Sequence, residues 1–117
     1  MGDVTADELK ERLGQVPLLD VRNESEYAGA AGYPCDPRQG HVPTARHLQL
    51  DRLMEAPGPE AVRELVGEPE GAEVIAYCHS GGRSAMAVQI LRGAGYDARN
   101  YAGSWHDWSS RAELPVE

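Results

Sequence analysis

The stretch Val74-Ile75-Ala76-Tyr77-Cys78-His79-Ser80-Gly81-Gly82-Arg83-Ser84 decides the fold of this chain. A short apolar run ends at Cys78, a loop with two glycines follows, and a helical pattern opens at Ser84. In this order the backbone N–H groups of the loop and the positive end of the helix dipole can converge on the sulfur. Both effects favour the thiolate, which is the reactive form of cysteine. We therefore interpret Cys78 as a reactive nucleophile rather than as a buried core cysteine at a strand end.

Short apolar segments alternate with helical patterns on both sides of this stretch. Strands are predicted over residues 16–21, 45–48, 73–77 and 98–101. Helices are predicted after a capping box at Thr5 and Glu8, after a cap at Asn23 or Ser25, and over residues 50–56, 59–66, 84–92 and 104–110. This alternation favours an α/β fold with a central parallel sheet and helices on both faces. Cys78 then stands at the carboxyl end of a strand, where open sheets of this kind form their sites.

Residues 29–43 contain repeated glycines and prolines and are predicted to form a long irregular loop. A loop of this length is unusual in a compact domain, which indicates a functional or packed loop.

The composition limits the class of protein. A chain of 117 residues is expected to form a single domain over residues 1–117. The net charge of −8 argues against nucleic-acid and anionic-membrane partners. No leader is expected, because residues 1–16 are polar, and no apolar run approaches the length of a membrane span.

The cysteine and histidine spacings indicate neither a disulfide framework nor a metal motif. The two cysteines, Cys35 and Cys78, suit a reducing, cytoplasmic compartment. No Cys-x-x-Cys or His-x-x-x-His spacing occurs, so no metal and no cofactor are expected.

Four segments in one order carry a resemblance to a known family. They are Leu19-Asp20-Val21-Arg22, Gly40-His41-Val42-Pro43-Thr44-Ala45, the Cys78–Ser84 loop and Gly103-Ser104-Trp105-His106-Asp107-Trp108. In this order and spacing the chain closely resembles the rhodanese family of sulfurtransferases, over residues from about 4 to 117. The last segment and the Leu114-Pro115-Val116-Glu117 tail are most similar to the catalytic half of tandem-domain thiosulfate and 3-mercaptopyruvate sulfurtransferases.

The resemblance implies a rhodanese-like α/β fold and an enzyme with covalent, ping-pong chemistry. Cys78 would take a sulfane sulfur from thiosulfate or 3-mercaptopyruvate and pass it from a persulfide to cyanide or a thiol. The expected partners are therefore a small-molecule sulfur donor and a thiophilic acceptor. The backbone N–H groups of the loop can stabilise the anionic donor and the persulfide. The expected substrate-binding residues are therefore His79, Ser80, Gly81, Gly82, Arg83 and Ser84.

The charged residues around the loop have separate expected roles. Arg83 is expected to contact the anionic donor in preference to bracing the loop. Asp20 and Arg22 are expected to form a structural ion pair that holds the loop, and His41 to be a satisfied structural histidine. For His79, tuning of the thiolate and exposure to solvent stay equal alternatives.

Two further expectations concern packing. Trp105 and Trp108 are three residues apart on a helical turn, which favours core or pocket-wall packing over ligand stacking. Cys35 lies in the irregular loop and is expected to be a surface thiol rather than a resolving cysteine.

The chain also departs from the family pattern. His79-Ser80 matches neither the basic residues that follow the cysteine in thiosulfate-type members nor the Gly-Ser of mercaptopyruvate-type members, although Ser80 favours the latter. Arg83-Ser84 is similar to the small single-domain members. Tandem members tend to carry an arginine where this chain has Glu26. The sequence therefore leaves the donor open.

Two other classes remain as alternatives. Cys-loop-Arg phosphatases and arsenate reductases place five residues between cysteine and arginine, whereas four separate Cys78 from Arg83. The shorter loop makes a smaller cradle that suits a sulfur atom better than a tetrahedral phosphoryl group. A non-enzymatic rhodanese-like binding module is the other alternative, because a fold does not imply a function.

Overall fold

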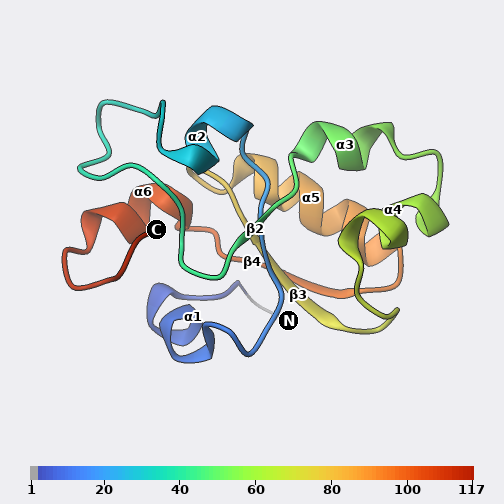
Figure 1. Ribbon diagram of the computed structural model, residues 1–117. Coiled ribbons are helices and arrows are strands. Elements are labelled where there is room, and N and C mark those ends of the chain that lie inside the picture. Colours follow the sequence, from blue (N-terminus) through green and yellow to red (C-terminus); the bar gives the residue numbers. More distant parts are fainter. Residues whose placement is uncertain (1–2) are drawn as a thin grey trace.

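A computed structural model describes residues 3–117 and contains one parallel sheet (Figure 1). Its four strands lie in the order β2-β1-β3-β4. The strands are β1 (Leu18–Asp20), β2 (Arg46–His47), β3 (Glu73–Tyr77) and β4 (Asp97–Asn100). The helices are α1 (Ala6–Arg12), α2 (Glu24–Ala28), α3 (Leu50–Glu55), α4 (Pro59–Val66), α5 (Gly82–Gly93) and α6 (Ser104–Ser110). The predicted α/β fold with a parallel sheet is confirmed, and β3 lies between β1 and β4.

Helices cover both faces of the sheet. Figure 1 shows α3 and α5 on one side of the strands and α1 on the other. Side chains of α3, α4 and α5 form one apolar cluster with the sheet, and side chains of α1 and α6 form a second. Successive β3 side chains alternate between the two clusters, as in any strand. Val74, Ala76 and Cys78 belong to the first cluster, whereas Ile75 and Tyr77 belong to the second.

The ends of several elements differ from the predicted ones. β2 and α3 are shorter than the predicted residues 45–48 and 50–56, and β4 begins and ends one residue before the predicted residues 98–101. β1 covers only Leu18–Asp20, although residues 16–21 form the apolar run. α5 begins at Gly82, two residues before the predicted start at Ser84. The glycine at position 82 is compatible with helical backbone, so the first turn of the helix reaches back into the loop. Arg83 consequently lies inside the first turn of α5, with Ser84, and not before the helix.

Two predicted helix caps can be compared with the structure. The Glu8 N–H donates to Thr5 Oγ1 at 3.2 Å, but the Glu8 carboxylate pairs with Arg99 instead of returning to the cap. A guanidinium partner attracts the carboxylate more strongly than a neutral N–H. For α2 the cap is Asn23 rather than Ser25, and a complete capping box joins Asn23 and Glu26.

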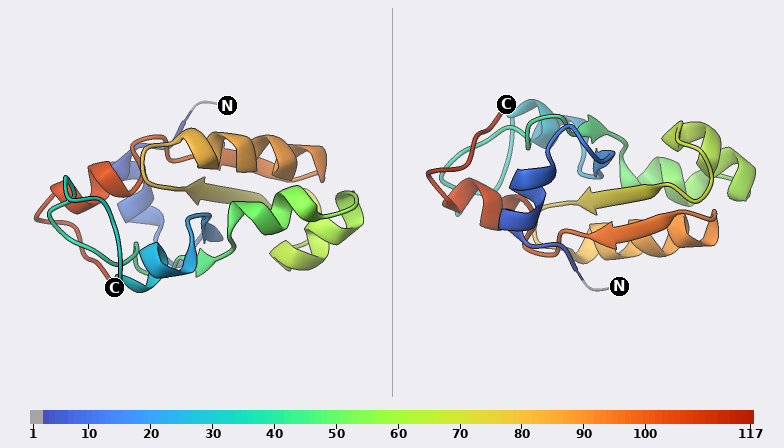
Figure 2. Two further views of the ribbon diagram at one scale, coloured as in Figure 1. Left: turned by 90° about the horizontal axis from the view of Figure 1, so that it is seen from above. Right: turned by 90° about the horizontal axis from the view of Figure 1, so that it is seen from below.

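The long loop between α2 and β2 packs against the C-terminal segment. In both views of Figure 2 the loop lies beside α6. The guanidinium of Arg38 donates to the backbone carbonyls of Trp108, Ser109, Arg111 and Leu114. The Arg38 carbonyl in turn accepts a hydrogen bond from Trp105 Nε1 at 3.0 Å. The loop is therefore packed, which is one of the two alternatives that its length indicates, and it is fixed against the end of the sheet that carries Cys78.

The aromatic side chains of α6 anchor the second cluster. Trp105 and Trp108 are both fully buried, as expected for core packing. Within residues 3–117, no helix has the length and apolar character needed to cross a bilayer.

Candidate active site

Cys78 directly follows β3, and its side chain is 1% exposed. Its Sγ accepts hydrogen bonds from the Gly81 N–H at 3.1 Å, the Ser84 N–H at 3.4 Å and the Ser84 hydroxyl at 3.4 Å. The loop and the first turn of α5 therefore curl around the sulfur. The predicted convergence of backbone N–H groups on Cys78 is present in the structure.

These donors decide the ionisation of the thiol. Burial alone would raise the pKa of Cys78, because it removes water from the thiolate. Hydrogen bonds from the Ser84 hydroxyl and from the backbone N–H groups of Ser84, Gly81 and Ser80 outweigh the burial. The pKa of Cys78 is consequently lowered, which increases the thiolate fraction at neutral pH.

Gly81 is required by the shape of the loop. Its φ of +99° lies in the left-handed region, and a Cβ added there would stand 2.6 Å from the Ala102 carbonyl oxygen. A side chain would therefore collide with the backbone that follows β4. Only glycine lets the Gly81 N–H point at Cys78 Sγ with this backbone so close.

The connection between β4 and α6 supports Cys78 from behind, and sequence reasoning missed it. The Cys78 N–H donates to Ser104 Oγ at 3.0 Å, and the Cys78 carbonyl accepts from the Trp105 N–H at 2.8 Å. Ser104 has a positive φ of 56°, which is uncommon for a residue with a side chain. Its hydroxyl also donates to the Tyr101 carbonyl at 2.8 Å. The sequence indicates the Gly-Ser-Trp segment only through its resemblance to the family, because the contact of this segment with Cys78 joins distant parts of the chain.

Arg83 is held by an acidic partner. Its two terminal nitrogens donate to the Glu26 carboxylate at 2.8 and 3.1 Å. Burial would raise the pKa of Glu26, but the Arg83 and Asn23 hydrogen bonds lower it, so Glu26 is anionic. Glu26 raises the pKa of Arg83 in turn, with a smaller contribution from the charge of Cys78. Arg83 is thus braced by Glu26, and a donor anion has to compete with this carboxylate. The sequence marked Glu26 only as a departure from the family.

Asp20 and Arg22 lie together under the long loop. Their buried ion pair has an N–O distance of 2.7 Å, and Arg22 also donates to the Gly40 carbonyl at 2.6 Å. Tyr77 donates to Asp20 at 2.7 Å and accepts from the Val42 N–H. The pair therefore ties β1 and β3 to the segment 40–42 of the long loop, and it does not bond to Cys78 itself.

The two predicted histidines occupy different surroundings. His41 stacks on Tyr27 with ring centroids 3.9 Å apart, and its Nδ1 lies 2.9 Å from the Tyr27 carbonyl oxygen. His79 stacks on Tyr33, and its Nε2 lies 3.0 Å from Asp36. Neither expectation for His79 describes this position, because its half-buried ring contacts the long loop rather than open solvent or the sulfur.

The remaining predicted loop residues surround the sulfur through their backbone. Ser80 is exposed and acts through its N–H group, and Gly82 is the first residue of α5. Arg83 also lines a shallow hollow whose other walls are Asn23, Glu26, Ala31, Gly32 and Tyr33. The structure therefore keeps His79, Ser80, Gly81, Gly82, Arg83 and Ser84 in the loop and first helical turn after Cys78. Asp20 and Arg22 instead contact each other and the long loop, and His41 stacks on Tyr27.

Comparison with known proteins agrees with this geometry. The rhodanese-like domain model matches residues 5–111. The thiosulfate sulfurtransferase of Pseudomonas aeruginosa is 32% identical over 97% of this chain and 45% of its own length. The sulfur carrier protein TtuD of Thermus thermophilus is 28% identical over 97% of this chain and 45% of its own length. A crystal structure described as a probable thiosulfate sulfurtransferase is 42% identical, with a TM-score of 0.87 over 98% of this chain and 47% of that one.

The chain spans about half the length of these relatives. The match nevertheless includes the four strands, the Cys78 loop and α6 in one continuous alignment. On its fold, its loop and this match, the chain belongs to the rhodanese-like domain family.

Proposed function

We propose that this domain is a sulfurtransferase in which Cys78 carries a sulfane sulfur as a persulfide. The observation that carries the proposal is the cradle of Gly81 and Ser84 donors on Cys78 Sγ, together with the lowered pKa of this thiol. A buried thiolate in such a cradle is a nucleophile that needs no separate base. The terminal sulfur of a persulfide is also an anion, and backbone N–H donors suit it for the same reason.

The reaction balances in two steps without an external oxidant. In the first step the Cys78 thiolate attacks the outer sulfur of thiosulfate, the S–S bond of the donor breaks, and sulfite leaves with the electron pair. In the second step the acceptor attacks the terminal sulfur, the persulfide S–S bond breaks, and the Cys78 thiolate returns. With cyanide the product is thiocyanate. With 3-mercaptopyruvate as donor, the thiolate attacks the donor sulfur and the C–S bond breaks. The carbon keeps the electron pair and takes the proton that the donor thiol gives up, which yields pyruvate.

The donor has to be an anion small enough to reach a deeply buried sulfur. The hollow beside Arg83 is the proposed approach, because Arg83 lines it and senses the charge of Cys78. Glu26 already neutralises Arg83, so a donor gains from the guanidinium only by sharing it with the carboxylate. This arrangement is compatible with thiosulfate and with 3-mercaptopyruvate, and weakens the attraction for either.

The acceptor is proposed to be cyanide or a thiol. The relative named as a sulfur carrier protein makes a thiol or persulfide-accepting partner a natural candidate in this family. A reactive free thiol suits a reducing compartment, and on that ground we propose a cytoplasmic location.

The test is mass spectrometry of the intact protein after incubation with thiosulfate and, separately, with 3-mercaptopyruvate. We expect the mass of a single added sulfur, its loss on addition of cyanide, and no addition in Cys78→Ser. Cys35→Ser is the matched control and should take up sulfur like the unchanged protein. If neither donor adds sulfur, the domain is a binding module instead. If Cys35→Ser is the inactive variant, the nucleophile is misassigned.

Glu26→Gln tests the proposed use of Arg83. The variant keeps the size of the side chain but releases Arg83 from its anionic partner. Persulfide formation from thiosulfate should become faster, whereas transfer to cyanide should change little. Arg83→Ala should slow the first step. Equal rates in all three proteins would mean that Arg83 only braces the loop.

Hydrolysis of an aryl phosphate by the unchanged protein tests the other enzyme class. We expect hydrolysis to be far slower than persulfide formation, because the four-residue loop closes on the sulfur atom itself. Faster hydrolysis than sulfur uptake would favour the phosphatase class.

A further inference from the structure

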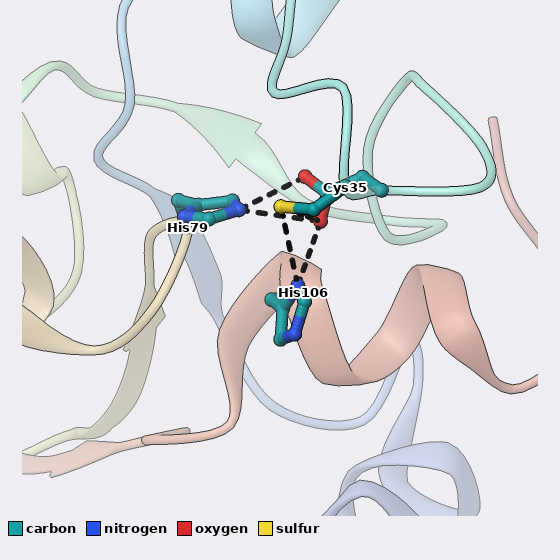
Figure 3. Close-up of side chains that lie close together, drawn as sticks. Cys35, His79 and His106 are labelled. Atoms are coloured by element: carbon teal, nitrogen blue, oxygen red, sulfur yellow. Dashed lines mark hydrogen bonds and ion pairs between the residues drawn. The ribbon is translucent and has the colours of Figure 1, made fainter.

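Four side chains with metal-binding atoms meet beside the Cys78 loop. They are Cys35, Asp36, His79 and His106, and one ligand atom from each lies within 4.8 Å of the others. Figure 3 shows Cys35, His79 and His106 pointing toward one another from the long loop, the Cys78 loop and α6. The spacing of cysteines, histidines and acidic residues along the chain does not predict this group, because its members come from three distant segments.

We propose that these four residues form a binding site for a zinc-class divalent cation. The donor set is one sulfur, one carboxylate oxygen and two imidazole nitrogens. Zinc accepts this mixture in tetrahedral sites, whereas hard cations such as magnesium prefer oxygen alone. Four protein ligands would leave no open position, which is the pattern of a structural rather than a catalytic zinc site.

The distances are close to those that a tetrahedral ion needs. Bonds of about 2.0–2.3 Å place neighbouring ligand atoms roughly 3.3–3.8 Å apart. Cys35 Sγ lies 3.9 Å from His106 Nδ1 and 3.8 Å from Asp36 Oδ1. The Asp36 contacts are shorter, at 2.9 Å to His106 Nδ1 and 3.0 Å to His79 Nε2. Binding therefore requires these two contacts of Asp36 to lengthen slightly, which the exposed His106 can accommodate.

Asp36 gives an independent indication of a ligand. Its side chain is 1% exposed, and no arginine or lysine of the described residues pairs with it. Its Oδ2 is buried without an aligned hydrogen bond, although His79 Nε2 lies nearby. A buried carboxylate oxygen that lacks a hydrogen bond is costly unless a cation completes it.

The charges of the cluster also match a divalent ion. A Cys35 thiolate and an Asp36 carboxylate supply two negative charges, and the two histidines bind as neutral rings. The bound ion would thus be neutralised in full. The Cys35 thiol gives its proton to the buffer when the S–metal bond forms, and no atom changes oxidation state.

Backbone and ring contacts hold the ligands close to these positions. The Asp36 N–H donates to the Tyr33 carbonyl at 3.0 Å, and prolines at positions 34 and 37 flank the Cys35-Asp36 pair. The His79 ring stacks on Tyr33 with centroids 3.8 Å apart. The His106 N–H donates to the His79 carbonyl at 2.9 Å, which holds α6 against the Cys78 loop. Such supports orient metal ligands and raise their affinity.

The test uses the full chain with Cys78→Ser, so that Cys35 is the only thiol. Isothermal titration with zinc should give one ion per chain. Cobalt should give the near-ultraviolet thiolate band and the intense visible bands of a tetrahedral site. Adding Cys35→Ser should remove the thiolate band, and adding His106→Ala should weaken zinc binding by at least about 10-fold. Both residues are exposed, so both variants should fold.

His47→Gln is the matched control, because His47 lies away from the cluster against the Arg22 carbonyl. Its zinc affinity should equal that of the Cys78→Ser parent. Equal zinc affinity in the parent, the Cys35→Ser protein and the His106→Ala protein would overturn the proposal and leave a hydrogen-bonded network. Loss of zinc binding in the Cys78→Ser parent would place the metal at the sulfur site instead. None of these readouts depends on sulfurtransferase activity.

Discussion

At the scale of single residues, the chemistry of Cys78 depends on a balance between burial and hydrogen bonds. A buried thiol without donors would have a raised pKa and would be inert. Here the Ser84 hydroxyl and the backbone N–H groups of Ser84, Gly81 and Ser80 lower the pKa of Cys78 in spite of the burial. The Ser84 hydroxyl is the donor that a substitution can remove without touching the backbone.

Ser84→Ala should therefore raise the pKa of Cys78. The rate of alkylation rises with pH as the thiolate forms, so its midpoint should move to higher pH. At neutral pH the variant should react more slowly, by roughly twofold to tenfold, because the long Ser84 hydrogen bond should contribute about 0.5–1.5 kcal/mol. Ser80→Ala is the control, since Ser80 acts through its backbone N–H. An unchanged midpoint in Ser84→Ala would mean that the backbone donors suffice.

At the scale of elements, short segments with strong local signals hold the site. α2 has five residues and carries Glu26, the partner of Arg83. A helix this short depends on its ends, and Asn23 closes a capping box while Gly29 ends the helix in the left-handed conformation. The Cys78 loop depends in the same way on two adjacent glycines, Gly81 and Gly82, which have different backbone conformations.

Asn23→Ala should lower the free energy of unfolding by about 1 kcal/mol, the usual effect of losing a side-chain cap. Urea denaturation measures the change. Ser25→Ala is the control, because Ser25 is an exposed residue inside α2, and should stay within about 0.5 kcal/mol of the unchanged protein. A larger loss in Ser25→Ala would contradict the assignment of the cap.

Gly81→Ala and Gly82→Ala should have opposite effects on stability. At Gly81 the left-handed φ and the Ala102 carbonyl both oppose a Cβ, so the variant should lose more than about 1 kcal/mol. At Gly82 a Cβ meets nothing within 4 Å, and Gly82 has helical backbone, so alanine should add roughly 0.5–1 kcal/mol. Thermal or urea unfolding of the pair compares them directly. Similar losses in both would mean that the loop backbone differs from the one described.

At the scale of the whole molecule, buried polar contacts join segments that the sheet alone would leave apart. Arg38 fixes the long loop to the C-terminal segment. Asp20, Arg22 and Tyr77 tie the same loop to β1 and β3. These contacts place Asp36 next to His79 and close the end of the sheet where Cys78 lies.

Asp20→Ala should destabilise the fold by about 3–5 kcal/mol, because it leaves the Arg22 guanidinium buried without its counter-charge. Guanidinium denaturation measures the loss. Glu11→Ala removes an exposed carboxylate and should change stability by less than about 0.5 kcal/mol. A small loss in Asp20→Ala would show that the Gly40 carbonyl and the neighbouring rings are enough to hold Arg22.

The sequence by itself determined the alternating order of the elements, the parallel sheet, and the position of Cys78 directly after β3 and before a loop with two glycines. These properties depend on local signals: apolar runs, caps such as Asn23, and glycines that a tight loop requires. These properties can be predicted from the sequence because each signal affects only residues within a few positions of it.

Only the tertiary structure decided which side chains from distant parts of the chain meet. Ser104 supports Cys78 across 26 positions of the chain, and Glu26 pairs with Arg83 across 57. Asp36 reaches His79 across 43 positions and His106 across 70. Such pairs leave no periodicity or spacing in the sequence, because their distance is set by how the loops fold over the end of the sheet. The pairing of Glu26 with Arg83 and the proposed metal ligands therefore follow from the tertiary structure alone.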